Sequence, residues 1–111
     1  MTPLYKELTA AEIGNYGERH VTNWLSAKGF RCYQNTQQPG CTDIDAKGNP
    51  TCLFVQVKTA IYPSLPASLS ADERTAIVRR ANNNNREAWL AQVSVSKDGN
   101  LIGEITWTKL N

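Results

Sequence analysis

The sequence predicts an α/β domain in which a mixed β-sheet is flanked by helices, in the order helix, three strands, helix, two strands (αβββαββ). Two capping-box motifs, at 9–12 and 70–73, each precede a helical pattern. A nearly continuous apolar strand at 51–59 is typical of the buried centre of a sheet. Alternating segments at 88–95 and 101–109 add two further strands.

The first helix is expected to begin at the N-cap Thr9, with Glu12 reaching back to it, and to run to Lys28 before ending at Gly29. Its apolar stripe is wide enough to cover one face of a sheet. The stripe consists of Ile13, Gly17, Val21, Trp24, Leu25 and Lys28.

Three strands are expected after this helix, at 30–34, 42–46 and 51–59. Pro39-Gly40 indicates a turn within 35–41, and Lys47-Gly48-Asn49-Pro50 indicates a tight turn before the third strand. Strands joined so closely can form a meander.

The second half begins with a proline-containing loop at 61–68, followed by a helix from the capping box at 70–73 to about residue 82. This helix should cross over and place the strand at 88–95 beside the central strand. A turn at 97–100 then leads into the strand at 101–109. The inner side of the second helix is expected to hold Ala76, Ile77 and Ala81.

Composition limits the class of protein. With 111 residues, of which 41% are hydrophobic, residues 1–111 suit one globular domain with one core. The longest apolar run is Leu53-Phe54-Val55, and residues 1–4 lead into charged residues, so we expect neither a membrane span nor a signal peptide and place the protein in the cytoplasm. Cys32, Cys41 and Cys52 are three cysteines without a CxxC pair, which argues against a disulfide framework or zinc site.

Four polar residues, Glu18, Asp43, Gln56 and Lys58, form the candidate site. Gln56 and Lys58 alternate along one face of the apolar third strand, and a buried lysine is costly unless it has a partner or reaches solvent. Asp43 lies on the neighbouring strand. Asp45 shares its face and is expected either to contribute to the site or to face solvent near the turn.

These residues suit a divalent metal beside a phosphodiester. Mg²⁺ prefers hard oxygen ligands, which Asp43 supplies as a carboxylate and Gln56 as a neutral amide. Glu18, on the first helix, would restore the negative charge that Gln56 lacks. Lys58 would hold the attacking water and stabilise charge on the phosphate.

On these residues the chain resembles the PD-(D/E)xK nuclease superfamily, in the variant whose last motif reads QxK. The matching segments are 17–18 on the first helix, 40–44 on the second strand and 54–58 on the third, within a core at 10–95. The resemblance implies a restriction-endonuclease-like core, dependence on Mg²⁺ or Mn²⁺ and hydrolysis of DNA phosphodiester bonds. The small size is similar to archaeal Holliday-junction resolvases.

The chain departs from the family pattern at two positions. Gln56 stands where many members carry Glu, and Thr42 rather than proline precedes Asp43. The first departure bears on metal affinity, whereas the second lies at a position that varies within the superfamily.

DNA is the expected partner. A net charge of +2 permits nucleic-acid binding where positive charge is clustered, and Arg79, Arg80 and Arg86 cluster at the end of the second helix. These arginines either contact DNA phosphates or form a solvated helix end.

Assembly and activity leave further alternatives open. The last strand, with Ile105 and Trp107, is a candidate edge that a second subunit would cover, which favours a homodimer. Trp24 and Trp89 are expected in the core or at the same contact. The chain could also be a subunit of a larger complex. The rival function is a non-catalytic nucleic-acid-binding or assembly protein that keeps the nuclease fold.

Overall fold

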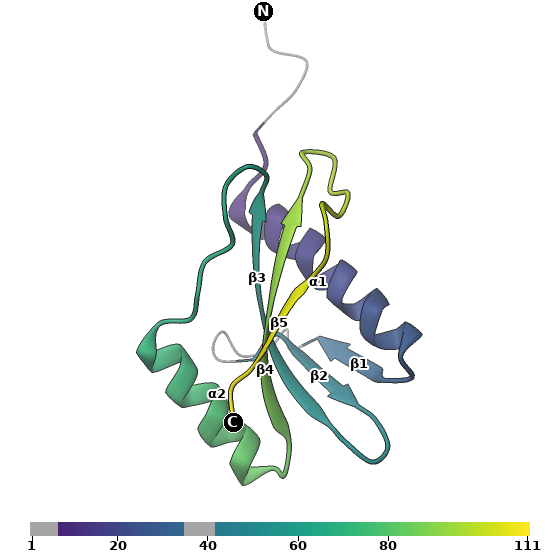
Figure 1. Cartoon of the computed structure of the whole chain (residues 1–111), viewed down its shortest axis with the longest axis vertical. Helices are drawn as coiled ribbons and strands as arrows, with labels where there is room; N and C mark the ends of the chain where they lie inside the picture. The colour runs from purple at the N-terminus through teal and green to yellow at the C-terminus, as the bar shows by residue number, and fades with distance from the viewer. Residues whose placement is uncertain (1–6, 35–41) are drawn as a thin grey trace, which may run out of the picture.

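The structure is a computed structural model that describes residues 7–34 and 42–111 (Figure 1). The turn expected within 35–41, with Gly40 and Cys41 of the motif, and the segment at 1–4 lie outside the described residues. The elements are α1 (Ala10–Ala27), β1 (Arg31–Gln34), β2 (Ile44–Lys47), β3 (Leu53–Ile61), α2 (Ala71–Asn83), β4 (Glu87–Val95) and β5 (Thr106–Lys109). This is the predicted order αβββαββ.

The five strands form one mixed sheet in the order β1-β2-β3-β4-β5. The first three strands are an antiparallel meander, β3 and β4 are parallel, and β5 is antiparallel to β4. Parallel neighbours need a crossover, which α2 provides. The predicted meander and crossover are both confirmed, and β3 lies at the centre of the sheet.

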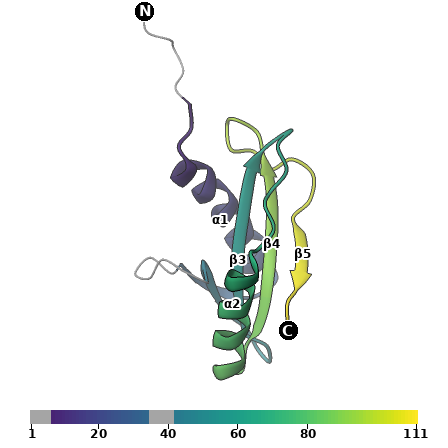
Figure 2. The same ribbon diagram turned by 90° about the vertical axis from the view of Figure 1, so that its left-hand side faces the viewer.

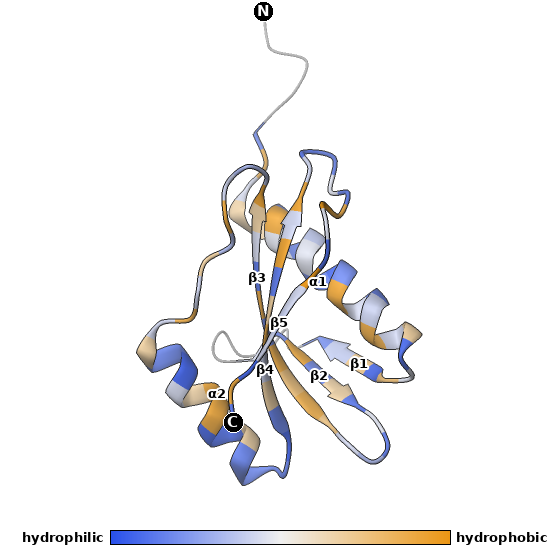
Figure 3. Cartoon of the chain, in the orientation of Figure 1, coloured by the Kyte–Doolittle hydropathy of each residue, from blue (hydrophilic) through white to orange (hydrophobic). Residues whose placement is uncertain are grey.

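The helices pack against opposite faces of the sheet, as the turned view shows (Figure 2). On one face, Val21 and Leu25 of α1 share a core cluster with Val55 of β3. On the other face, Ile77 of α2 packs with Phe54 of the same strand. Successive side chains of a strand point to opposite faces, so one strand serves both cores. Apolar colour accordingly runs along nearly the whole first half of β3 (Figure 3).

Both predicted capping boxes are present. The Thr9 hydroxyl accepts from the Glu12 amide at 3.1 Å, and the Glu12 carboxylate accepts from the Thr9 amide at 3.1 Å. Ser70 and Glu73 make the same reciprocal pair at the start of α2. Gly29 follows the end of α1 with a φ of +96°, the left-handed conformation that glycine adopts without strain.

Gly17 sets the distance between α1 and the sheet. A Cβ atom added at Gly17 would collide with the side chain of Thr59 on β3, whereas one added at Gly14 meets nothing within 4 Å. The missing side chain therefore allows α1 to approach β3 closely at this point. The next residue, Glu18, is brought toward the sheet by the same contact.

The last strand is shorter than predicted. β5 begins at Thr106, and the segment before it makes only an isolated bridge between Leu101 and Val95. Gly103 has a φ of +71°, which interrupts an extended chain. The alternation of apolar residues from 101 onward was therefore misleading. β5 does form an edge of the sheet, as predicted.

Several smaller boundaries also differ. β2 begins at Ile44, so Asp43 immediately precedes the strand, and β3 runs from Leu53 to Ile61. Ala76 was expected on the inner side of α2 but is exposed, because the buried stripe of that helix is limited to Ile77 and Ala81.

The three tryptophans gather between α1 and the β4–β5 edge. Trp24 and Trp107 have ring centroids 4.9 Å apart, and Trp89 meets Trp107 edge-on at 6.2 Å. Cys32 and Cys52 are free thiols. Neither helix in the described ranges is long and apolar enough to cross a membrane.

Candidate active site

Asp43 is fixed directly to the central strand. Its Oδ2 accepts a 2.8 Å hydrogen bond from the Val57 amide, and its own amide donates to the Val55 carbonyl at 3.0 Å. The chain before β2 is therefore hydrogen-bonded to β3 at the residues on either side of Gln56. The hydrogen bond from the Val57 amide engages Oδ2 of the carboxylate and not Oδ1.

Gln56 and Lys58 lie on the face of β3 that also carries Phe54, the face covered by α2. Gln56 is only 6% exposed, and its side-chain Oε1 has no hydrogen-bond partner within the described ranges. A buried acceptor without a partner costs free energy. Gln56 therefore presents a neutral oxygen that a cation or water would satisfy.

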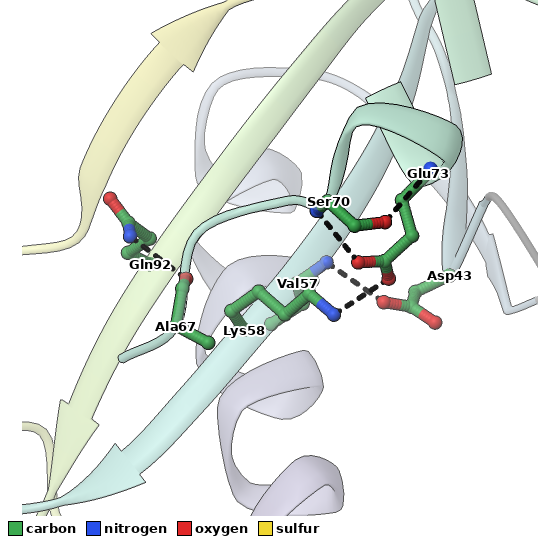
Figure 4. A network of polar contacts seen from close by, with 7 residues as sticks. All are labelled: Asp43, Val57, Lys58, Ala67, Ser70, Glu73 and Gln92. Atoms are coloured by element: carbon green, nitrogen blue, oxygen red, sulfur yellow. Dashed lines mark hydrogen bonds and ion pairs between the residues drawn. The ribbon is translucent and has the colours of Figure 1, made fainter. Parts of the chain in front are cut away.

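Lys58 is held by a residue from the second helix. Its Nζ donates to Glu73 Oε2 at 2.8 Å, and Glu73 Oε1 accepts from the Ser70 amide at 3.0 Å (Figure 4). The side chains of Lys58 and Glu73 are 24% and 35% exposed. The ammonium thus sits at the rim of the site, partly shielded from water.

The electrostatic environment couples the predicted acids. Burial raises the pKa of Glu18, and the negative charge of Asp43 raises it further. Burial likewise raises the pKa of Asp43, although the Val57 amide and Lys58 oppose that shift and Glu73 adds to it. Two carboxylates that repel one another across a partly buried site are stabilised as anions by a cation between them.

The donor set fits a hard divalent cation. Glu18 and Asp43 offer charged oxygens, and Gln56 offers a buried neutral one that lacks a partner. Mg²⁺ commonly binds through one or two carboxylates and keeps several waters. Across residues 7–34 and 42–111, no group of three or more Asp, Glu, His or Cys side chains is arranged to hold a metal ion. A cation here would therefore depend on the two acids and the Gln56 amide together with water.

Asp45 belongs to a different contact. Its Oδ1 lies 3.6 Å from Nη2 of Arg86, in an ion pair whose side chains are 28% and 17% exposed. Asp45 therefore neither faces open solvent nor points free into the candidate site. It joins β2 to the chain that follows α2.

The three predicted DNA-contacting arginines have different surroundings. The guanidinium carbons of Arg80 and Arg86 lie 4.6 and 4.9 Å from the centroid of the Phe54 ring, so both stack on a core aromatic. Arg79 is exposed on α2. Of the three, Arg79 is the one whose side chain is open to solvent.

Glu73 is the site residue that the sequence reasoning did not include. Its place in the capping box accounts for a glutamate at this position without any contact to β3. The available signal was its position, because α2 is the crossover that follows β3 and packs back against that strand.

Comparison with solved structures places this geometry in a known context. The chain superimposes on Hjc, a Holliday junction resolvase from the archaeal hyperthermophile Archaeoglobus fulgidus, with a TM-score of 0.71 and 28% identity over 87% of this chain and 72% of that one. No family model matches the sequence, and no curated protein does.

The structural match confirms the resemblance and the fold inferred from sequence. Archaeal Hjc is a PD-(D/E)xK nuclease, and this chain shares its α/β architecture. The likeness points to a nuclease-like, DNA-processing role.

Proposed function

We propose that this protein is a metal-dependent DNA endonuclease that hydrolyses phosphodiester bonds with Mg²⁺ or Mn²⁺. The observation that carries the proposal is the buried Oε1 of Gln56, which has no hydrogen-bond partner among the described residues and lies on the same face of β3 as Lys58, with Asp43 hydrogen-bonded to that strand. Buried acceptors usually have a hydrogen-bond partner, and beside Lys58 and Asp43 a metal ion or a water molecule would supply one.

Each residue has a role in this proposal. Asp43 is the principal metal ligand, and Glu18 and Gln56 are supporting ligands or hold waters. A bound Mg²⁺ supplies Lewis-acid stabilisation of the phosphate and lowers the pKa of a water. Lys58 orients the attacking water and stabilises the charge that develops on the phosphate. Water loses a proton to solvent as its oxygen bonds to phosphorus, the P–O bond to one sugar breaks, and the departing oxygen takes up a proton from solvent.

DNA binding would use the exposed arginine of α2. Arg79 is the best placed of the predicted contacts, since Arg80 and Arg86 already stack on Phe54. Losing one phosphate contact should lower affinity similarly for all sequences and reduce the salt slope by about one. Arg79→Ala is therefore expected to weaken DNA binding without altering the metal requirement.

A homodimer is part of the proposal, because cutting two strands or two junction arms calls for two active sites. The β5 edge, which carries Trp107, offers a strand for such a contact. A mass measured by light scattering in the presence of DNA that corresponds to a monomer would count against it.

The likeness to a Holliday junction resolvase makes a four-way junction the first substrate to test. Plasmid, linear duplex and four-way-junction DNA would be incubated with Mg²⁺ or with chelator, using the wild type, Lys58→Ala and the exposed control Lys97→Ala. We expect cutting that requires the metal, is lost in Lys58→Ala and persists in Lys97→Ala. The preferred DNA identifies the substrate class.

The alternative is a binding or assembly protein on a nuclease fold. It predicts no cutting of any of the three DNAs, with DNA affinity unchanged by chelator and by Lys58→Ala. That combination of results would reject the endonuclease in favour of the binder.

A further inference from the structure

We propose that Glu73 is a positioning residue for Lys58, supplied from α2 in place of the carboxylate that position 56 lacks. The inference rests on the proposed endonuclease function and concerns how its lysine is held. It starts from the 2.8 Å ion pair between Lys58 Nζ and Glu73 Oε2, which the capping motif alone does not require.

The first step is the geometry of β3. Residues 56 and 58 are two apart on one strand, so their side chains leave the same face about 7 Å apart at the backbone. A glutamate at 56 would therefore place a carboxylate beside the lysine. Gln56 carries no charge, and the strand itself offers Lys58 no counter-ion.

The second step is the need for a counter-ion. The Lys58 side chain is only 24% exposed, and a partly buried ammonium is costly without a paired charge. Asp43 attracts Lys58 electrostatically, but one of its oxygens is occupied by the Val57 amide. Glu73 makes the direct contact.

The third step is that Glu73 is itself held in place. Its Oε1 accepts from the Ser70 amide at 3.0 Å while Oε2 faces Lys58. The chain leading into α2 is tethered as well, because Gln92 of β4 donates to the Ala67 carbonyl at 2.9 Å (Figure 4). Both oxygens of the Glu73 carboxylate have a partner, and the chain leading into its helix is tethered to β4. Such a carboxylate can hold an ammonium in one position.

The capping box makes a clean substitution available. Glutamine is accepted at this position of the motif, so Glu73→Gln keeps the cap and removes the charge that faces Lys58. Asp72→Asn is the matched control, since Asp72 is the exposed neighbouring acid in the same helical turn. Gln56→Glu returns a carboxylate to the strand.

The experiment is a double-mutant cycle of Glu73→Gln and Gln56→Glu, with Asp72→Asn alongside. Single-turnover cleavage, the KM for DNA and Mn²⁺ affinity by calorimetry would be measured. We expect Glu73→Gln to lower the cleavage rate about 10- to 100-fold, the usual range for residues that orient a site, with KM within about twofold. The Glu73→Gln/Gln56→Glu double variant should regain most of that loss.

A second readout does not depend on cleavage. In ¹⁵N-lysine NMR, the Lys58 ammonium should be protected from exchange in the wild type and in Asp72→Asn, and should lose that protection in Glu73→Gln.

The outcomes separate this inference from the endonuclease proposal. If the wild type cuts DNA but Glu73→Gln behaves like Asp72→Asn in rate and in NMR, Glu73 has no positioning role while the nuclease stands. A rate loss that Gln56→Glu fails to restore would also reject the inference. If nothing is cut, the NMR comparison still decides whether Glu73 holds Lys58.

Discussion

The two faces of β3 differ in what their side chains do, although they alternate along one strand. Val55 and Val57 face α1 within a cluster of buried apolar side chains, and Val55 is fully buried. Gln56 and Lys58 face α2, where one buried oxygen lacks a partner and the lysine needs a carboxylate from another element. The face toward α1 stabilises the fold, whereas the face toward α2 holds polar groups in place at some cost in stability.

The helices differ in the same way. α1 approaches the sheet closely enough to require glycine at position 17, and it buries Val21 and Leu25. α2 buries only Ile77 and Ala81 among the described residues, and its first turn pairs with Lys58. The α1 face is therefore expected to respond to mutation in stability and the α2 face in activity.

The largest effect is expected from Asp43→Asn. Removing the principal charged ligand should lower Mg²⁺-dependent cleavage by about 100-fold or more, as losing a group that stabilises the transition state does. The fold should survive, because asparagine can still accept from the Val57 amide. Cleavage kinetics and thermal unfolding would be compared with those of Asp98→Asn, in the exposed turn at 97–100. Equal cleavage by the two variants would remove Asp43 from the site.

Val55→Ala should lower stability and leave cleavage nearly unchanged. Val55 is 0% exposed within the α1-face cluster, and truncation of a buried aliphatic side chain leaves a cavity. We expect the free energy of unfolding to fall by about 2 kcal/mol, measured by urea denaturation. Cleavage well below the melting temperature should remain within a few-fold of wild type. A large loss of activity in a folded Val55→Ala protein would show that the two faces are not separable.

Gly17→Ala tests the close approach of α1. The added methyl group collides with Thr59, so the helix or the strand must shift, at a cost of about 1–3 kcal/mol. Gly14→Ala is the matched control on the same helix, where the added methyl group meets nothing within 4 Å. It should stabilise the helix by about 0.5–1 kcal/mol. Both values come from urea denaturation, and equal effects of the two substitutions would contradict the packing argument.

Much of the fold was accessible from sequence because its signals are local. The capping boxes at Thr9 and Ser70 fixed both helix starts, and the continuous apolar run of β3 identified the central strand. The strand expected at 101–109 failed because alternation does not reveal the left-handed backbone at Gly103. In this segment the alternation of side chains favours a strand, whereas the backbone conformation at Gly103 prevents one.

A site residue could be predicted from sequence only where its side chain is unusual for the helix or strand that carries it. Gln56 and Lys58 stand out as polar residues on a buried strand, and a hydrogen bond from the Val57 amide joins Asp43 to that strand. Glu73 contradicts nothing locally, since a capping glutamate is ordinary at a helix start. Its contact with Lys58 depends on where the crossover helix returns to the sheet, which is tertiary information.

The smallest effect is expected from pH and Glu18. Burial and Asp43 raise the pKa of Glu18 above its ordinary value of 4.5, so the folded protein binds this proton more tightly than the unfolded chain does. Stability is then lost as pH rises from below 4.5 through the raised pKa. In the presence of chelator, Glu18→Gln should therefore raise the melting temperature at pH 7.

That gain should vanish near pH 3.5, where the carboxyl group is protonated in both states. The exposed Glu104→Gln variant serves as the control and should show no such difference between the two pH values. With saturating Mg²⁺ at pH 7, the wild type should melt at a higher temperature than Glu18→Gln. The cation binds the ionised Glu18 carboxylate and so stabilises the form that is unfavourable in the metal-free fold. A Glu18→Gln protein that is stabilised equally with and without Mg²⁺ would show that Glu18 lies on the structural side of the molecule, with the α1 face, and not with the metal.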